Sequence, residues 1–374
     1  MPGGDDCPVC GLPRSLNRKL VWTTDGGIYF QARRSERLIF LEEEDIGALL
    51  EEGVKLHGDK LLETLRERRR AFTREEVASQ ITGLRRILLR HWPLARRMVR
   101  SSFLEAAFFG CGNIVITRLK PRKELVVKAR HPYHPHLMAG DIWGFWEGFF
   151  GVEALLSLSP ASEHEWDITV RTAERKRRRV TREKTPRRPK RDYSLEVCEK
   201  CHLPLFPWQL RWDAELGTIY EAGTHRHMMV TSAAGWQQVI DEVNGGGESV
   251  FPPAVGAALA AASAAEYRQL KGDNYKTAYR HFFLSLPFLG WGKPARVTRR
   301  PFLIEAEIEG VPFPQLLAWK IAGVFEALER EPADIKHLKI RDGTWKYLIG
   351  PRLDGVFLEI RRMLPEEGRF FLPF

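Results

Sequence analysis

The motif Cys-x-x-Cys-x-Leu-Pro occurs twice in this chain, and it constrains the fold more than any other feature of the sequence. The first copy, "CPVCGLP", covers residues 7–13, and the second, "CEKCHLP", covers residues 198–204. A Cys-x-x-Cys pair at a turn supplies half of a structural zinc site, because structural tetrahedral zinc takes four protein ligands. Each copy by itself is therefore an incomplete site.

The similarity between the two parts of the chain continues beyond the cysteines. The segment "LVWTTDGGIYF" (20–30) corresponds to "LRWDAELGTIYE" (210–221) in the second part of the chain. Each segment predicts two strands joined by a polar turn that contains glycine. Residues 108–155 align in the same way with 288–335. The aligned positions include these pairs: Gly110 with Gly290, Gly112 with Gly292, and Pro135 with Pro314. We therefore expect an ancient tandem duplication.

The expected fold class is α+β, in which each repeat has a CxxC β-hairpin module, helices, and an antiparallel sheet with packed helices. The expected boundaries of the first repeat (1–172) are a zinc knuckle at 5–41, a helical region at 42–107 and a final module at 108–172. A basic linker covers 173–193. The second repeat (194–374) has its knuckle at 196–232, its helical region at 233–287, its final module at 288–350 and a C-terminal tail at 351–374.

The repeat makes a distant pairing of the cysteines credible. If two similar halves pack about a pseudo-two-fold axis, their knuckles can meet on it, and one structural Zn²⁺ would have these four ligands: Cys7, Cys10, Cys198 and Cys201. Two alternatives remain open: a homodimer that pairs like knuckles, and separate knuckles without metal. A redox CxxC is less consistent with the sequence, because that motif usually opens a helix after a strand.

Charge and composition narrow the class of protein. A chain of 374 residues that is 44% hydrophobic can bury a core in each of two domains. Residues 174–191 hold eleven Lys and Arg against two Glu, which is +9 of the net charge of +10, so we expect a solvated tether that can also contact nucleic acid. The sequence has no apolar run of the roughly 18 to 20 residues that a membrane span needs and no hydrophobic leader, so we expect a cytoplasmic protein.

The modules at Gly110–Val170 and Gly290–Leu348 resemble the 4-vinyl reductase domain family, described as small-molecule or hydrocarbon-binding domains. The resemblance lies in a Gly-x-Gly turn, paired strands, a helix that opens Pro-x-x-x-Ala and continues to Gly-x-x-Glu, and a closing strand. It implies an antiparallel sheet with helices and a buried pocket for an apolar or aromatic molecule. The residues that would line such a pocket are Trp143, Trp146, Phe150, Trp319 and Phe325. At helical spacing, ordinary core packing is the alternative for them.

Three other features of the sequence indicate a functional site less specifically than the paired cysteines do. The loop "HPYHPH" places His131, His134 and His136 together, and imidazoles suit transition metals, although the aligned segment of the second repeat has no histidine. Cys111 lies between two glycines and is expected to be an inert thiol. Glu147 and Glu326 occupy equivalent helix positions, either as polar contacts or as surface carboxylates.

These features predict a non-enzymatic, zinc-stabilised, pseudo-dimeric protein that senses or carries a small apolar ligand or mediates assembly with a protein partner. One alternative is a nucleic-acid-associated regulator that uses the basic linker and the Arg-rich helical stretch at 66–100. Another is an accessory subunit in aromatic or hydrocarbon metabolism.

Overall fold

The computed structural model describes residues 6–81, 92–173, 195–206, 210–213, 215–222, 225–246, 251–268, 275–300, 302–352 and 370–371. They form two compact units that alternate along the chain. Unit 1 draws on residues 53–186 and 210–246, and unit 2 draws on 7–52, 187–209 and 247–374. Repeats along a sequence and compact units in space need not coincide, so the predicted repeat boundaries stay predictions.

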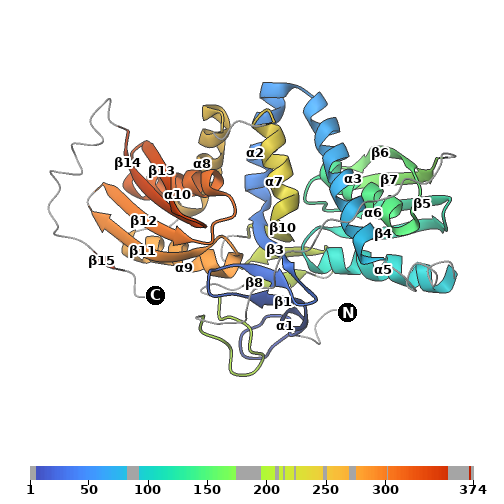
Figure 1. Cartoon of the computed structure of the whole chain (residues 1–374), viewed down its shortest axis with the longest axis horizontal. Coiled ribbons are helices and arrows are strands. Elements are labelled where there is room, and N and C mark those ends of the chain that lie inside the picture. The colour runs from blue at the N-terminus through green and yellow to red at the C-terminus, as the bar shows by residue number, and fades with distance from the viewer. Residues whose placement is uncertain are drawn as a thin grey trace. The chain divides into compact units, whose positions relative to one another are not determined.

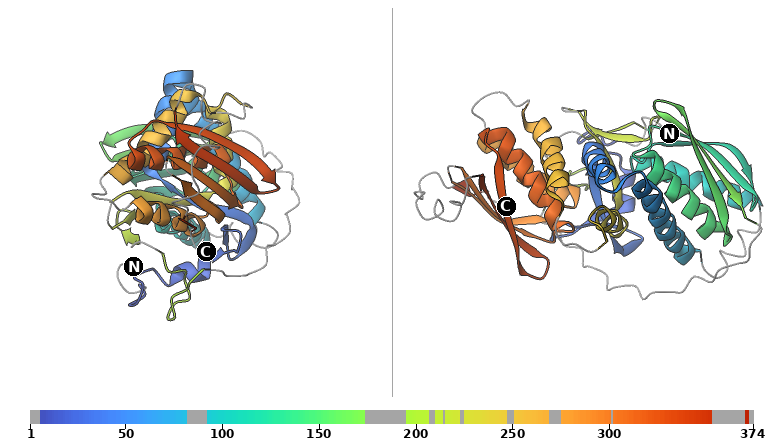
Figure 2. Two further views of the ribbon diagram at one scale, coloured as in Figure 1. Left: turned by 90° about the vertical axis from the view of Figure 1, so that its left-hand side faces the viewer. Right: turned by 90° about the horizontal axis from the view of Figure 1, so that it is seen from above.

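The centre of unit 1 is an antiparallel sheet in the order β4-β5-β7-β6. Its strands are β4 (Asn113–Lys120), β5 (Glu124–Arg130), β6 (Ala154–Ser162) and β7 (Glu165–Thr172). Alternate residues of β5 are buried, namely Leu125, Val127 and Ala129, which is the pattern of a strand with one covered face. Helix α6 (Pro135–Phe150) packs on the sheet, and α3 (Lys60–Gln80) packs beside α6 (Figures 1 and 2).

Unit 1 also holds α5 (Trp92–Phe108), α7 (Ala233–Val243) and an antiparallel meander of β8 (Leu210–Asp213), β9 (Thr218–Glu221) and β10 (His227–Ser232). The turn between β8 and β9 packs on the Gly-x-Gly turn that precedes β4, where the Gly112 N–H donates to the Gly217 carbonyl at 2.9 Å. Both glycines have positive φ, and a Cβ on Gly217 would lie 2.6 Å from the Gly112 carbonyl carbon. Glycine is needed there because two backbones approach so closely.

Unit 2 has a corresponding sheet in the order β13-β14-β12-β11-β15. The strands are β11 (Lys293–Arg300), β12 (Leu303–Glu309), β13 (Ala333–Arg341), β14 (Thr344–Pro351) and β15 (Phe370–Phe371). The helices that accompany it are α8 (Pro253–Arg268), α9 (Tyr275–Leu289) and α10 (Pro314–Glu329) (Figure 1). Both α6 and α10 begin at a proline, which suits the first helical position because its missing N–H would have no helical partner there.

Unit 2 includes the N-terminal segment as well, with α1 (Ser15–Lys19), β1 (Leu20–Trp22), β2 (Ile28–Phe30) and β3 (Arg33–Glu42). Helix α2 (Glu43–His57) follows and contains the boundary between the units. The Trp22 indole donates to the Phe288 carbonyl at 3.0 Å, and the Trp291 indole donates to the Phe40 carbonyl at 3.0 Å. The hairpin that precedes the linker is thus packed with the module that follows it.

The fold class is α+β with antiparallel sheets, as the sequence predicts. The tandem duplication itself stays a prediction. Residues 174–193 of the basic linker and most of the C-terminal tail lie outside the described residues.

Candidate metal centre

Each CxxC segment forms the same tight loop. In the first loop the Cys7 N–H donates to the Leu12 carbonyl and the Gly11 N–H donates to the Cys7 carbonyl, both at 2.8 Å. In the second loop the Cys198 N–H donates to Leu203 and the His202 N–H donates to Cys198, also at 2.8 Å each. The turn residues have positive φ, 73° at Gly11 and 57° at His202. These bonds fold each loop around the space that its two sulfurs face.

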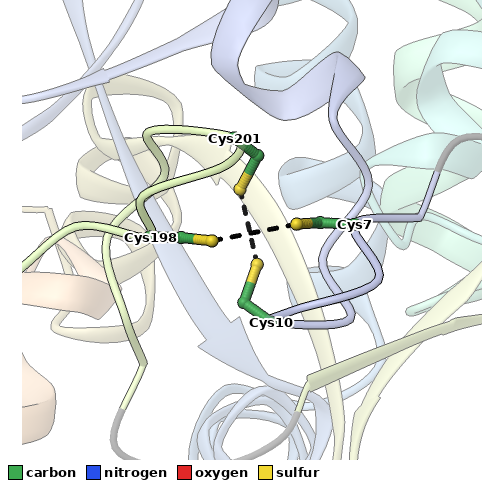
Figure 3. Close-up of side chains that lie close together, drawn as sticks. All are labelled: Cys7, Cys10, Cys198 and Cys201. Carbon is green, nitrogen blue, oxygen red and sulfur yellow. Dashed lines mark hydrogen bonds between the residues drawn. The ribbon is translucent and has the colours of Figure 1, made fainter.

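The two loops bring all four sulfurs together (Figure 3). The Sγ atoms of Cys7 and Cys198 are 3.8 Å apart, those of Cys10 and Cys201 are 3.4 Å apart, and all four lie within 4.8 Å of one another. In Figure 3 each side chain points from its loop towards the same central point. The four cysteines can therefore hold a metal ion, as the sequence predicts.

The sulfur distances fit a metal rather than a disulfide. Zinc–sulfur bonds of about 2.3 Å at the tetrahedral angle place sulfurs about 3.8 Å apart, within the range seen here. A disulfide needs a sulfur–sulfur bond of about 2.05 Å, and all four cysteines are free thiols. The four sulfurs could therefore surround a metal ion as a closed four-thiolate site.

Burial and backbone dipoles act in opposite directions on the thiols. Cys7 and Cys198 are each 1% exposed and Cys201 is 7% exposed. The backbone N–H of Cys10 lowers the pKa of Cys7 to about 6, whereas burial raises the pKa of Cys10 and of Cys201. Four adjacent thiols that must become thiolates need a cation between them, so metal binding releases protons.

One further residue supports the centre, and sequence reasoning missed it. The Asn17 Nδ2 donates to the Cys201 carbonyl at 3.0 Å, which ties helix α1 to the second loop. The neighbouring Leu16 is fully buried and fixes the helix. No pattern in the sequence pairs Asn17 with a residue 184 positions away.

The aromatic residues predicted to line a pocket lie in both units. In unit 1 the Trp143 indole donates to the Ala154 carbonyl at 3.0 Å, the Trp146 indole donates to Thr172 at 3.2 Å, and Phe150 contacts Trp146 with ring centroids 4.5 Å apart. In unit 2 Phe325 is fully buried and the Trp319 ring packs on Gly256. These contacts favour core packing, and a pocket role stays a prediction.

Glu147 is buried in this structure and is therefore not a surface carboxylate. It is 1% exposed, it pairs with Arg70 at 2.8 Å, and it accepts the Ala154 N–H at 2.8 Å. Glu326 accepts the Ala333 N–H at 3.0 Å in the same way. Each carboxylate therefore satisfies the backbone at the start of the strand that follows its helix.

The histidine loop and Cys111 do not form a metal group with three donors in the described part of the chain. Burial lowers the pKa of His134 to about 4, and the rings of His134 and His136 are 5.9 Å apart. Burial also raises the pKa of Cys111 to about 12, which keeps this thiol protonated and unreactive at neutral pH.

Within the described residues, no helix has the length and apolar composition that crossing a membrane requires. Comparison with protein-family models, with curated proteins and with solved structures finds no match to this chain. The resemblance to the 4-vinyl reductase domain family therefore stays a prediction that rests on the motifs themselves.

Proposed function

We propose that this chain is a non-enzymatic binding protein whose fold depends on one structural zinc ion held by Cys7, Cys10, Cys198 and Cys201. The observation that supports the proposal is the convergence of four thiol sulfurs within 4.8 Å from two segments on opposite sides of the linker. The ion would cross-link these segments and contribute folding free energy, on the order of 10 kcal/mol in small zinc peptides.

The ligand set favours a structural role over a catalytic one. A catalytic zinc keeps a position for water or substrate, whereas four protein thiolates complete the tetrahedron. Tetrahedral thiolate sites hold zinc or iron, and zinc fits a site without a redox task. The metal ion would therefore hold the loops in place and take no part in a reaction.

Metal analysis of the purified chain tests the site. We expect one zinc per chain, lost in both Cys7→Ser and Cys198→Ser, because each change removes one ligand from the same ion. Cys111→Ser is the matched control and should keep its zinc, since this thiol is not among the four. Retention of a full zinc equivalent by either ligand variant would contradict the shared site, and iron would contradict the choice of metal.

A small apolar ligand is the second part of the proposal, and its support is the family resemblance. Native mass spectrometry of the purified full-length chain tests it. A bound apolar molecule that is released on denaturation supports carriage of a ligand. A mass equal to the chain plus one zinc ion contradicts it and favours a scaffold.

A further inference from the structure

Helix α5 presents a groove lined by arginines on the surface of unit 1. The groove has a volume of about 500 Å³ and is lined by Pro93, Arg96, Arg97, Arg100, Ser101 and Leu104. All six residues are exposed to solvent, and Leu104 is 71% exposed. The spacing of the arginines at i, i+1 and i+4 places three guanidinium groups along the same side of one helix.

These arginines differ from those of α3, the other part of the Arg-rich stretch. On α3, Arg69 pairs with Asp141 at 2.9 Å and Arg70 pairs with Glu147 at 2.8 Å, so their charges are neutralised within the unit. In the described part of the chain, no ion pair is found for Arg96, Arg97 or Arg100. Among the described arginines of this stretch, the exposed ones for which no ion pair is found therefore lie on α5.

The chemistry of the groove selects its ligand. A guanidinium group matches two phosphate oxygens with a rigid pair of N–H donors and remains charged at any physiological pH. Pro93 and Leu104 add apolar surface beside the charges, which suits the faces of unstacked bases, and arginine planes can stack on bases as well. A duplex keeps its bases stacked inside a rigid cylinder, so it would present only its phosphates to the arginines and no base faces to Pro93 and Leu104.

We propose that the α5 groove is a binding site for single-stranded nucleic acid, in which Arg96, Arg97 and Arg100 contact successive phosphates. This site does not depend on the proposed zinc function, and it is distinct from the basic linker. Contacts of this kind are electrostatic and tolerant of sequence.

The test uses the full-length chain and a fluorescently labelled 12-mer of thymidylate, with anisotropy measured across a series of salt concentrations. The variant Arg96→Gln/Arg97→Gln/Arg100→Gln should bind about 100-fold more weakly at 50 mM salt. Its slope of log affinity against log salt should be smaller by about 2, because each lost phosphate contact removes roughly 0.7. Glutamine preserves helix propensity, and a thermal melt compares the folding of each variant with that of the unaltered chain.

The matched control is Lys120→Gln/Arg122→Gln/Lys123→Gln, which removes the same charge from exposed positions at the β4–β5 turn of the same unit. The control should bind as the unaltered chain does, since the linker contributes equally to all three proteins. Equal binding by the α5 variant and the control overturns the proposal. It is also overturned if a duplex 12-mer or anionic vesicles bind more tightly than the single strand, or if thymidine monophosphate at the same phosphate concentration displaces it.

Discussion

Buried charges in this chain find their partners in distant segments. Lys320 is 4% exposed and donates to Glu42 at 2.8 Å and to Asp45, and Arg69 is 6% exposed and donates to Asp141. In sequence each of them is only a charged residue within or beside a helix. Removal of one partner would leave a buried charge uncompensated and would destabilise the fold by about 3 to 5 kcal/mol. These pairs therefore disfavour any arrangement of the chain that separates the partners.

The buried side chain of His134 leads us to predict that the stability of the folded chain depends on pH. Burial, with a smaller effect from His136, lowers its pKa to about 4 from the ordinary 6.5, so the unfolded chain binds the proton more readily than the folded one does. The contribution of neutral His134 to the free energy of unfolding is fully present above pH 6.5 and is lost as the pH falls towards 4. The total loss is at most about 3 kcal/mol.

Chemical denaturation at pH 7 and at pH 4.5 measures this effect in the unaltered chain and in His134→Gln. The difference in the free energy of unfolding between the two pH values should be smaller in the variant, because glutamine does not titrate. Any loss of the proposed zinc ion from the four cysteines at pH 4.5 affects both proteins equally, so it cancels in the comparison. An equal pH dependence in both proteins would assign the acid sensitivity to other groups.

At the scale of elements, the close approach of α3 and α6 depends on three glycines. A Cβ on Gly140 would lie 2.5 Å from the Arg66 carbonyl oxygen, a Cβ on Gly148 would lie 2.6 Å from that of Arg74, and Gly144 is as close to Arg70. The i, i+4, i+8 spacing predicts a face that another backbone can approach, and the structure shows that α3 is this backbone. The sequence does not name the partner because the contact joins segments about 70 residues apart.

We predict that Gly144→Ala destabilises the chain by about 1 to 3 kcal/mol, because the methyl group meets backbone atoms of α3 that cannot move independently. Gly47→Ala is the control. Gly47 lies within α2 with nothing within 4 Å of its would-be Cβ, so alanine should be neutral or stabilise by up to about 1 kcal/mol. Denaturant titration compares the two, and equal stability would show that the helices separate at little cost.

The hairpins are a second case in which the element was predictable and its partner was not. Polar turns that contain glycine, each between two short runs rich in apolar residues, predict the strands of both hairpins. In unit 1 the Trp212 indole donates to the Phe108 carbonyl at 3.1 Å, which matches the bond from Trp22 to Phe288 in unit 2. Each hairpin therefore packs with the module that lies on the other side of the linker.

At the scale of the whole molecule, both units are built from segments on both sides of the linker, and the four cysteines of the candidate metal centre all belong to unit 2. Removal of the proposed zinc by a chelator should therefore loosen unit 2 first. We expect amide hydrogen exchange to speed up more than tenfold at residues 7–13 and 197–205, where the loop hydrogen bonds lie. Exchange in β5 and β7 of unit 1 should remain unchanged.

The control for this experiment is Cys198→Ser, in which the chelator should have no further effect because the proposed metal is already absent. Exchange that is identical with and without chelator in the unaltered chain would contradict a structural role for the ion. Uniform acceleration across both units would instead indicate global unfolding and would contradict a local effect.

The sequence by itself determined the elements, the α+β class and the four cysteines, because strand alternation, helix periodicity, glycine turns and a repeated motif are local or internal patterns. Tertiary structure alone decided what each element contacts: the packing of each hairpin on the module from the other side of the linker, the support of Cys201 by Asn17, the ion-paired arginines of α3, and the exposed arginines of α5, for which the described residues provide no ion pair. The physical reason is that a side chain's pattern records which face it occupies, whereas its partner depends on which distant backbone reaches that face.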